Sequence, residues 1–198
     1  MHHVIGNHCV LMPLPGLQAA LGLGGCTYYT LRETGWRFVV LDGVEINLWR
    51  ETRAAALAWL DTHKDEPHAV GWNGGLSDGQ FAWLQAQLTE ATAAGERVLI
   101  FCHMPVLKEA SDYRHLLYDH QRVLALLRAT PAVVAWIAGH FHPGGYARDG
   151  HVHHVTLQAV LEAPSNSTAY GYIDVYPDLA RLRGYGSMRS YDLDAVMP

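Results

Sequence analysis

The sequence lacks the long hydrophobic runs that membrane proteins need. Its longest wholly apolar stretch is Ala132 to Ala138, AVVAWIA, whereas a membrane-spanning helix needs about 20 such residues. No charged-then-apolar leader precedes the first hydrophobic segment. These absences predict a soluble chain that is neither exported nor inserted into a membrane.

Basic clusters and paired cysteines are also missing. No run of Lys and Arg could follow a phosphate backbone, and the formal net charge is −5, so nucleic acid is not an expected partner. The three cysteines, Cys9, Cys26 and Cys102, are odd in number and form no CxxC motif. This pattern argues against a disulfide framework or a zinc ribbon, and we expect a reducing, cytoplasmic setting.

Length and composition predict one globular domain. The chain has 198 residues, of which 49% are hydrophobic and 17% charged, and it contains no repeat or linker. We therefore treat residues 1–198 as a single domain. The unusual count is that of histidine, 13 in all, which raises the question of a metal site.

Hydrophobic patterns alternate between strands and helices. Ser77, followed three residues later by Gln80, predicts a capping box that starts a helix, and Gly95 predicts its end. Asp119 is expected to cap a second helix. Apolar runs that end at His103 and just before His140 predict buried strands. Residues 2–5, HHVI, are expected to form an opening strand, and the tail from residue 153 is expected to form consecutive antiparallel strands. The sequence therefore predicts an α/β fold with two packed sheets.

Metal-competent side chains follow several of the expected strands. They are Asn7 and His8 after the first, His103 after an inner strand, and His140 and His142 after the next. Ligands gather at the carboxyl ends of strands in open α/β sheets because loops converge there. We therefore expect these residues to lie together.

The ordered set of motifs resembles a known family. GNH, an apolar strand ending in His, and GHxH occur here in the order found in calcineurin-like metallophosphoesterases. The blocks HHVIGNHC, RFVVLDG, NGGLSDGQFAWL, HMPVLKEASD, AGHFHPGGY and HHVTLQAVLEAP resemble the manganese-dependent ADP-ribose and CDP-alcohol diphosphatase branch. The resemblance implies a four-layer αββα sandwich and a hydrolase that acts on a small nucleotide-type molecule.

The resemblance also implies roles for individual residues. Two divalent metal ions are expected, Mn²⁺ first, with Mg²⁺, Fe or Zn²⁺ as alternatives. Asn7, His103 and His140 would hold one ion and His142 the other. His8 would be the general acid, or would stabilise the leaving oxygen.

The family pattern also contains two aspartate motifs that precede GNH, and neither occurs in this sequence. We therefore expect an N-terminally truncated domain that lacks the first strands, with an incomplete site and impaired activity. A neutral Asn/His remnant should favour Zn²⁺ or Ni²⁺ over Mn²⁺. Two alternatives stay open: an inactive binding or structural module completed by a partner chain, and a one-metal hydrolase that uses Asn7, His103 and His140. The sequence does not indicate an oligomeric state.

Several other polar residues could reach the site but are more typical of turns, solvent contacts or packing. They are the carboxylates Asp42, Glu109 and Asp112, the histidines His151, His153 and His154, Cys9, and the turn Asn73–Gly75. On an alternating strand, His151 and His153 would share one face and His154 would lie on the other.

Overall fold

The computed structural model describes residues 2–195. Its helices are α1 (Leu14–Leu21), α2 (Arg53–Thr62), α3 (Asp78–Ala93) and α4 (His120–Arg128), with short 3-10 helices η1 (Cys9–Leu11), η2 (Lys108–Ala110), η3 (Tyr113–His115) and η4 (Val160–Glu162). Its strands are β1 (Tyr29–Glu33), β2 (Trp36–Val40), β3 (Arg97–Phe101), β4 (Val133–Ala138), β5 (Gly145–Asp149), β6 (Val152–Thr156), β7 (Ala169–Val175), β8 (Leu179–Gly186) and β9 (Tyr191–Asp194). No helix within residues 2–195 combines the length and apolarity needed to cross a bilayer.

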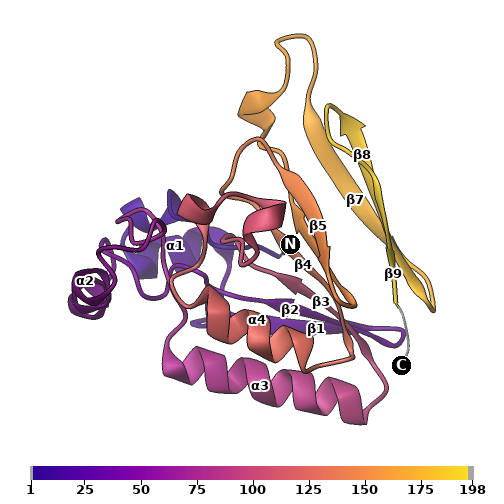
Figure 1. Ribbon diagram of the computed structural model, residues 1–198, viewed down its shortest axis with the longest axis horizontal. Helices are drawn as coiled ribbons and strands as arrows, with labels where there is room; N and C mark the ends of the chain where they lie inside the picture. The colour runs from indigo at the N-terminus through magenta and orange to yellow at the C-terminus, as the bar shows by residue number, and fades with distance from the viewer. Residues whose placement is uncertain (1, 196–198) are drawn as a thin grey trace.

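The strands form two sheets. The larger sheet has the order β1-β2-β3-β4-β6-β5, with parallel pairing from β2 through β6 and antiparallel edge strands. The smaller sheet is β7-β8-β9. Helices α3 and α4 cover one face of the larger sheet, and the smaller sheet covers the other (Figure 1). This layering confirms the α/β class with two packed sheets.

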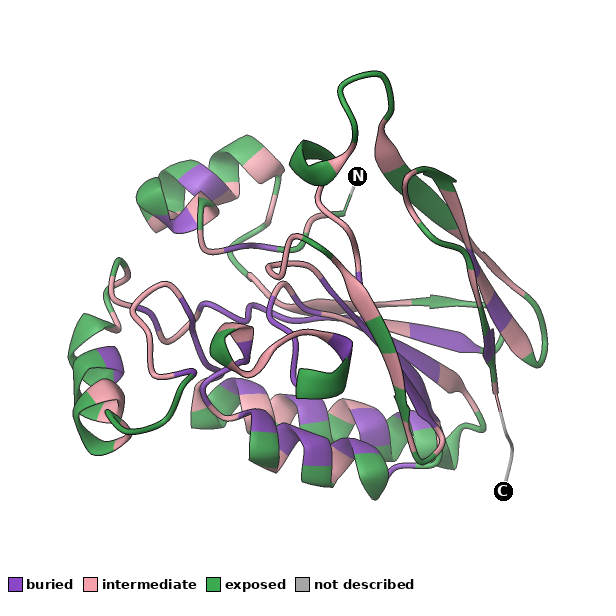
Figure 2. Cartoon of the chain, turned by 45° about the horizontal axis from the view of Figure 1, so that its top comes forward, coloured by how far each residue is buried: buried purple, intermediate pink, exposed green. Residues whose placement is uncertain are grey.

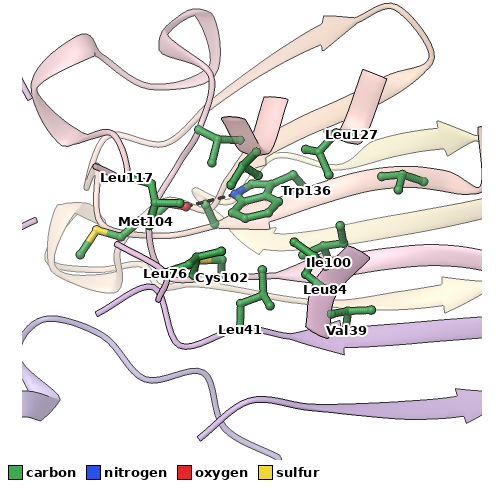
Figure 3. Packing of buried hydrophobic residues seen from close by; sticks show 14 of the residues in the cluster. Val39, Leu41, Leu76, Leu84, Ile100, Cys102, Met104, Leu117, Leu127 and Trp136 are labelled. Carbon is green, nitrogen blue, oxygen red and sulfur yellow. Dashed lines mark hydrogen bonds between the residues drawn. The ribbon is translucent and has the colours of Figure 1, made fainter. Parts of the chain in front are cut away.

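The first core lies between the larger sheet and the two covering helices. Ile100 of β3 points into this layer with Leu84 of α3 and Leu127 of α4, all fully buried. The indole N–H of Trp136 also lies here and donates to the carbonyl oxygen of Met104 at 3.1 Å (Figure 3). Because the indole is 1% exposed, this bond satisfies a donor that water cannot reach.

The second core lies between the two sheets. Leu99 alternates with Ile100 along β3 and therefore faces the opposite layer, where it meets Leu182 and Leu193 of the smaller sheet. In Figure 2 buried residues concentrate along the inner strands, and exposed residues cover the outer sides of the helices and loops. Burial on both faces explains the apolar runs of the two central strands, β3 and β4.

The start of α3 was predicted correctly, but its capping differs from a full capping box. The Ser77 hydroxyl accepts a hydrogen bond from the Gln80 backbone N–H at 3.1 Å. The Gln80 side chain does not return to Ser77 and instead bonds the backbone of Asp42 after β2. Glu45 accepts the Ser77 N–H in its place. The cap therefore ties α3 to the loop that follows β2.

Two other expectations were wrong. Residues 2–5 form no strand; the backbone of His3 bonds only the hydroxyl of Tyr29, because no neighbouring strand pairs with this segment. The HHVT segment is not part of an antiparallel tail. It lies in β6 of the larger sheet, which pairs in parallel with β4 and antiparallel with β5, and the antiparallel tail consists of β7, β8 and β9.

The histidines of β6 take packing roles on opposite faces, as predicted. His153 pairs with Ala135, faces the smaller sheet, and contacts the hydroxyl of Tyr146 at 2.9 Å. His154 faces the helix layer and is 2% exposed, and neither of its ring nitrogens has a hydrogen-bond partner. Burial lowers the pKa of His154 to about 4.

Replacing His154 with leucine is expected to make the fold more stable in mild acid. Between pH 6.5 and 4 the unfolded histidine binds a proton that the folded one excludes, so stability falls as the pH drops. Leucine removes this loss, which by pH 5 reaches about 2 kcal/mol at most, at about 1.4 kcal/mol per pKa unit.

Urea unfolding at pH 7.5 and pH 5 measures the effect. The exposed His2→Leu variant is the control. An unchanged difference in unfolding free energy between the two pH values in His154→Leu would contradict this assignment.

Candidate metal centre

The adjacent parallel strands β3 and β4 bring two of the predicted ligands together. Phe101 pairs with Ile137 near the ends of the strands, and the Gly139 N–H donates to the His103 carbonyl oxygen at 3.0 Å. His103 and His140 therefore leave the same edge of the sheet, with ring centroids 5.1 Å apart. This is the convergence predicted from the strand ends.

The segment before η1 adds Asn7 to the pair. Its side-chain Oδ1 lies 2.9 Å from His103 Nε2. Gly6 makes this approach feasible, because a Cβ at that position would lie 2.9 Å from the His103 ring. The glycine of the GNH motif is therefore required for backbone-to-ring packing.

The predicted residues border one open cleft of about 460 Å³. Its walls are Asn7, His8, Trp72, His115, His140, Phe141, His142, Pro143 and Glu162. His8 is exposed and immediately precedes η1. His142 Nδ1 lies 3.7 Å from Glu162 Oε1. The structure thus gathers Asn7, His8, His140 and His142 around one cleft, with His103 beside Asn7.

Burial keeps the inner histidines neutral. Desolvation, reinforced by the nearby His8 and His142, lowers the pKa of His103 to about 4. Desolvation also lowers the pKa of His140 to about 3, with further contributions from His103, His115, His142 and His8. Neutral imidazole is the form that binds a metal, so both rings have the right protonation state at pH 7.

The donor set fits one divalent ion. Asn7 Oδ1 and His103 Nε2 lie 2.9 Å apart, at hydrogen-bond distance, so a bound ion would replace this hydrogen bond with two metal–ligand bonds. His140 supplies a third neutral donor beside them. Within residues 2–195 no three His, Cys, Asp or Glu side chains gather closely enough to hold an ion by themselves, so the amide oxygen of Asn7 is an essential part of the set.

Three further residues at the site were not predicted. Asn73, expected only in a turn, accepts a hydrogen bond from His140 Nε2 at 2.8 Å. The His115 ring stacks edge-on against His140, and its Nδ1 bonds Asp112 at 2.7 Å. Trp72 lines the cleft. The only sequence signal for Asn73 and Trp72 was the Gly-Gly turn that follows them, and His115 had no signal.

The other candidate carboxylates have structural roles, as expected. Asp112 caps η3 by accepting the His115 backbone N–H. Asp42 is fully buried, accepts the Val44 N–H, and pairs with Arg50 at 3.1 Å. Glu109 is exposed on η2.

Two more candidates are structural as well. His151 bonds the carbonyl oxygen of Thr130, and Cys9 packs against the first core. Neither residue lines the cleft.

Comparison with known proteins identifies the family. No family model matches the chain. The manganese-dependent ADP-ribose/CDP-alcohol diphosphatase of Arabidopsis thaliana is 32% identical, over 98% of this chain and 70% of its own length. The rice protein of the same name is 30% identical, over 97% and 67%. This chain belongs to that diphosphatase family.

A solved structure agrees with the family assignment. A dimetal phosphatase from Danio rerio superposes on the chain with a TM-score of 0.90 and 30% identity, covering 98% of this chain and 72% of that one. The diphosphatase fold expected from the GNH and GHxH motifs is therefore confirmed.

The Gly6→Ala substitution is expected to weaken metal binding at the candidate centre. The new Cβ would sit 2.9 Å from the His103 ring and displace it from Asn7. Gly139 is a matched comparison, because a Cβ there would meet the same ring at an ordinary 3.5 Å.

Titration calorimetry with Mn²⁺ measures the difference. Changes to residues that hold a ligand in place commonly cost about 10-fold to 100-fold in metal affinity, and we expect a loss of that size for Gly6→Ala and a much smaller one for Gly139→Ala. Equal affinities in the two variants would show that Gly6 does not position His103.

Proposed function

We propose that this chain hydrolyses the phosphoanhydride of a nucleoside-diphosphate-linked substrate of the ADP-ribose or CDP-alcohol type, with Mn²⁺ as the preferred ion. The observation that carries the proposal is the placement of Asn7 and His103 within 2.9 Å, beside His140, at the edge of a substrate-sized cleft. The family relatives are named for this substrate class and this metal.

The low positive charge of the cleft lining supports the proposal that bound cations are needed to hold a diphosphate. Among the described residues that line the cleft, Glu162 is the only Asp, Glu, Lys or Arg, and burial lowers the pKa of His140, which favours its neutral ring. A diphosphate carries at least two negative charges, which this neutral-to-acidic lining does not balance. Divalent ions held by Asn7, His103 and His140, with His142 nearby for a second ion, would supply the missing positive charge.

In the proposed reaction water attacks one phosphorus atom and the bridging P–O bond breaks. Divalent ions, when bound, would supply Lewis-acid activation of the water and positive charge beside the phosphate oxygens. Asn7, His103 and His140 contribute neutral donors held in place by the sheet edge. His8, exposed on the cleft wall, would give its proton to the departing phosphate oxygen, and the proton released by water returns to solvent.

Aromatic side chains support binding of a nucleotide. Trp72 and Phe141 both line the cleft, and the guanidinium carbon of Arg114 lies 5.0 Å from the centre of the Trp72 ring. A nucleobase can stack on such rings. We propose that this aromatic wall binds the base while the histidines surround the diphosphate.

The cellular setting and extent of the domain are part of the same proposal. All three cysteines are free thiols, which suits a reducing cytoplasm. The two cores share the larger sheet, which supports treating residues 1–198 as one phosphoesterase domain.

Purified protein with Mn²⁺ is expected to convert ADP-ribose to AMP and ribose 5-phosphate, and CDP-glycerol to CMP and glycerol phosphate. The His8→Ala variant should lower kcat by about 10²-fold to 10⁴-fold, the usual contribution of a general acid. Its Mn²⁺ affinity should stay close to wild type, because His8 is not among the proposed ligands. Chromatography of the nucleotide products measures turnover.

The same experiment distinguishes the alternatives. A folded protein with no turnover under any divalent metal would favour a binding or structural module that a partner completes. Turnover with one bound equivalent of metal would favour a one-metal hydrolase, and two equivalents would exclude it. Equal turnover in wild type and His8→Ala would remove His8 from the mechanism.

Trp72→Ala is expected to raise KM about 2-fold to 10-fold, since an aromatic pair contributes about 0.5–1.5 kcal/mol, while kcat changes little. Trp49→Ala is the matched control, because Trp49 is 49% exposed and lies outside the cleft. Steady-state kinetics with ADP-ribose measures both. An unchanged KM in Trp72→Ala would place the nucleobase elsewhere.

A further inference from the structure

Asn73 connects a distant loop to a proposed metal ligand. It lies between α2 and α3, is fully buried, and its Oδ1 is 2.8 Å from His140 Nε2. A buried amide aimed at one nitrogen of a ligand histidine can decide which nitrogen remains for the metal.

The orientation of the Asn73 amide is fixed by its other partners. Its Nδ2 donates to the carbonyl oxygens of His68 and Arg114, both at 2.9 Å. Carbonyl oxygens only accept hydrogen bonds, so the NH₂ group must face them. A flipped amide would set its oxygen against two other oxygens. The atom that faces His140 is therefore the amide oxygen.

An oxygen at this position requires a proton on His140 Nε2. A neutral imidazole carries one N–H, so Nδ1 then holds the lone pair. Within residues 2–195, His140 Nδ1 makes no hydrogen bond. His140 Nε2 is thus hydrogen-bonded to Asn73, and Nδ1 remains available to bind a metal ion.

The backbone of His140 supports a specific placement of the ring. Its φ of +67° lies in the left-handed region, which side chains other than glycine rarely adopt. Such a conformation persists where the surrounding contacts hold it. Here Asn73 holds the ring nitrogen, and the rings of His103 and His115 each pack edge-on against the imidazole.

We propose that Asn73 is a positioning residue of the metal centre, which holds His140 in the Nε2–H tautomer and leaves Nδ1 as its ligand atom. The inference rests on the proposed function only for the ligand role of His140. The tautomer belongs to the metal-free protein and can be measured without turnover.

A neighbouring residue provides a matched control. Asn47 is also fully buried, and its Nδ2 donates to the Asn73 backbone carbonyl at 2.8 Å. The Asn47→Ala variant therefore loosens the same loop but leaves the Asn73 side chain in place. Any effect that depends only on loop stability should appear equally in Asn47→Ala and Asn73→Ala.

The first measurement is ¹⁵N–¹H NMR of the metal-free protein at pH 7. We expect a slowly exchanging Nε2–H signal for His140, assigned by its loss in His140→Gln, because a buried hydrogen-bonded proton exchanges slowly with water. Asn47→Ala should retain the signal, because it leaves the Asn73 side chain in place. Asn73→Ala should lose it.

The second measurement is Mn²⁺ affinity by titration calorimetry. Asn73→Ala should bind Mn²⁺ about 10-fold to 100-fold more weakly than wild type, whereas Asn47→Ala should bind it with close to wild-type affinity. Circular dichroism confirms that each variant is folded, and the wild-type NMR result does not depend on any variant at Asn73.

Different failures have different meanings. A protonated Nδ1 in wild-type protein, or equal affinity losses in Asn73→Ala and Asn47→Ala, would overturn the positioning role of Asn73. An Nε2–H tautomer in a protein that binds no divalent metal would overturn the ligand role of His140 and the proposed function with it.

Discussion

The hydrogen-bonded contact between β3 and β4 is the constraint on which the candidate site depends. The ladder continues past the strands through Gly139 N–H and the His103 carbonyl, at 3.0 Å. This bond fixes the backbones that carry both inner histidines. Every other contact at the site, including the close approach of Gly6 and Asn7, is built onto a geometry that the parallel pair has already set.

Local sequence signals were sufficient to predict a candidate site residue where that residue follows the end of a strand. His103 and His140 follow apolar runs that are buried on both faces, so the run itself marks where the side chains emerge. The same logic failed for residues 2–5, which are apolar enough for a strand but have no partner along their backbone. It also failed to place β6, because hydrophobic pattern does not specify which strand is the neighbour.

Residues that support the ligands were not predictable in the same way. Asn73 lies 67 positions before His140, in a segment that reads as a turn. Its role depends on two carbonyl oxygens, from His68 and Arg114, that only the folded chain brings together. The position of His115 at the site likewise depends on two contacts, a hydrogen bond with Asp112 and edge-on packing against His140. Such partners are assembled by tertiary structure and leave no periodic signal.

The neutral state of the buried histidine rings connects the burial of the site to its chemistry. Burial lowers the pKa of His103 and His140, which keeps their rings available to a cation but also removes the positive charge that could attract a diphosphate directly. With the proposed function, a cleft with this lining would bind its anionic substrate through the cation that it holds. The neutral donors would then bind the ion, and the aromatic wall formed by Trp72 and Phe141 would bind the rest of the substrate.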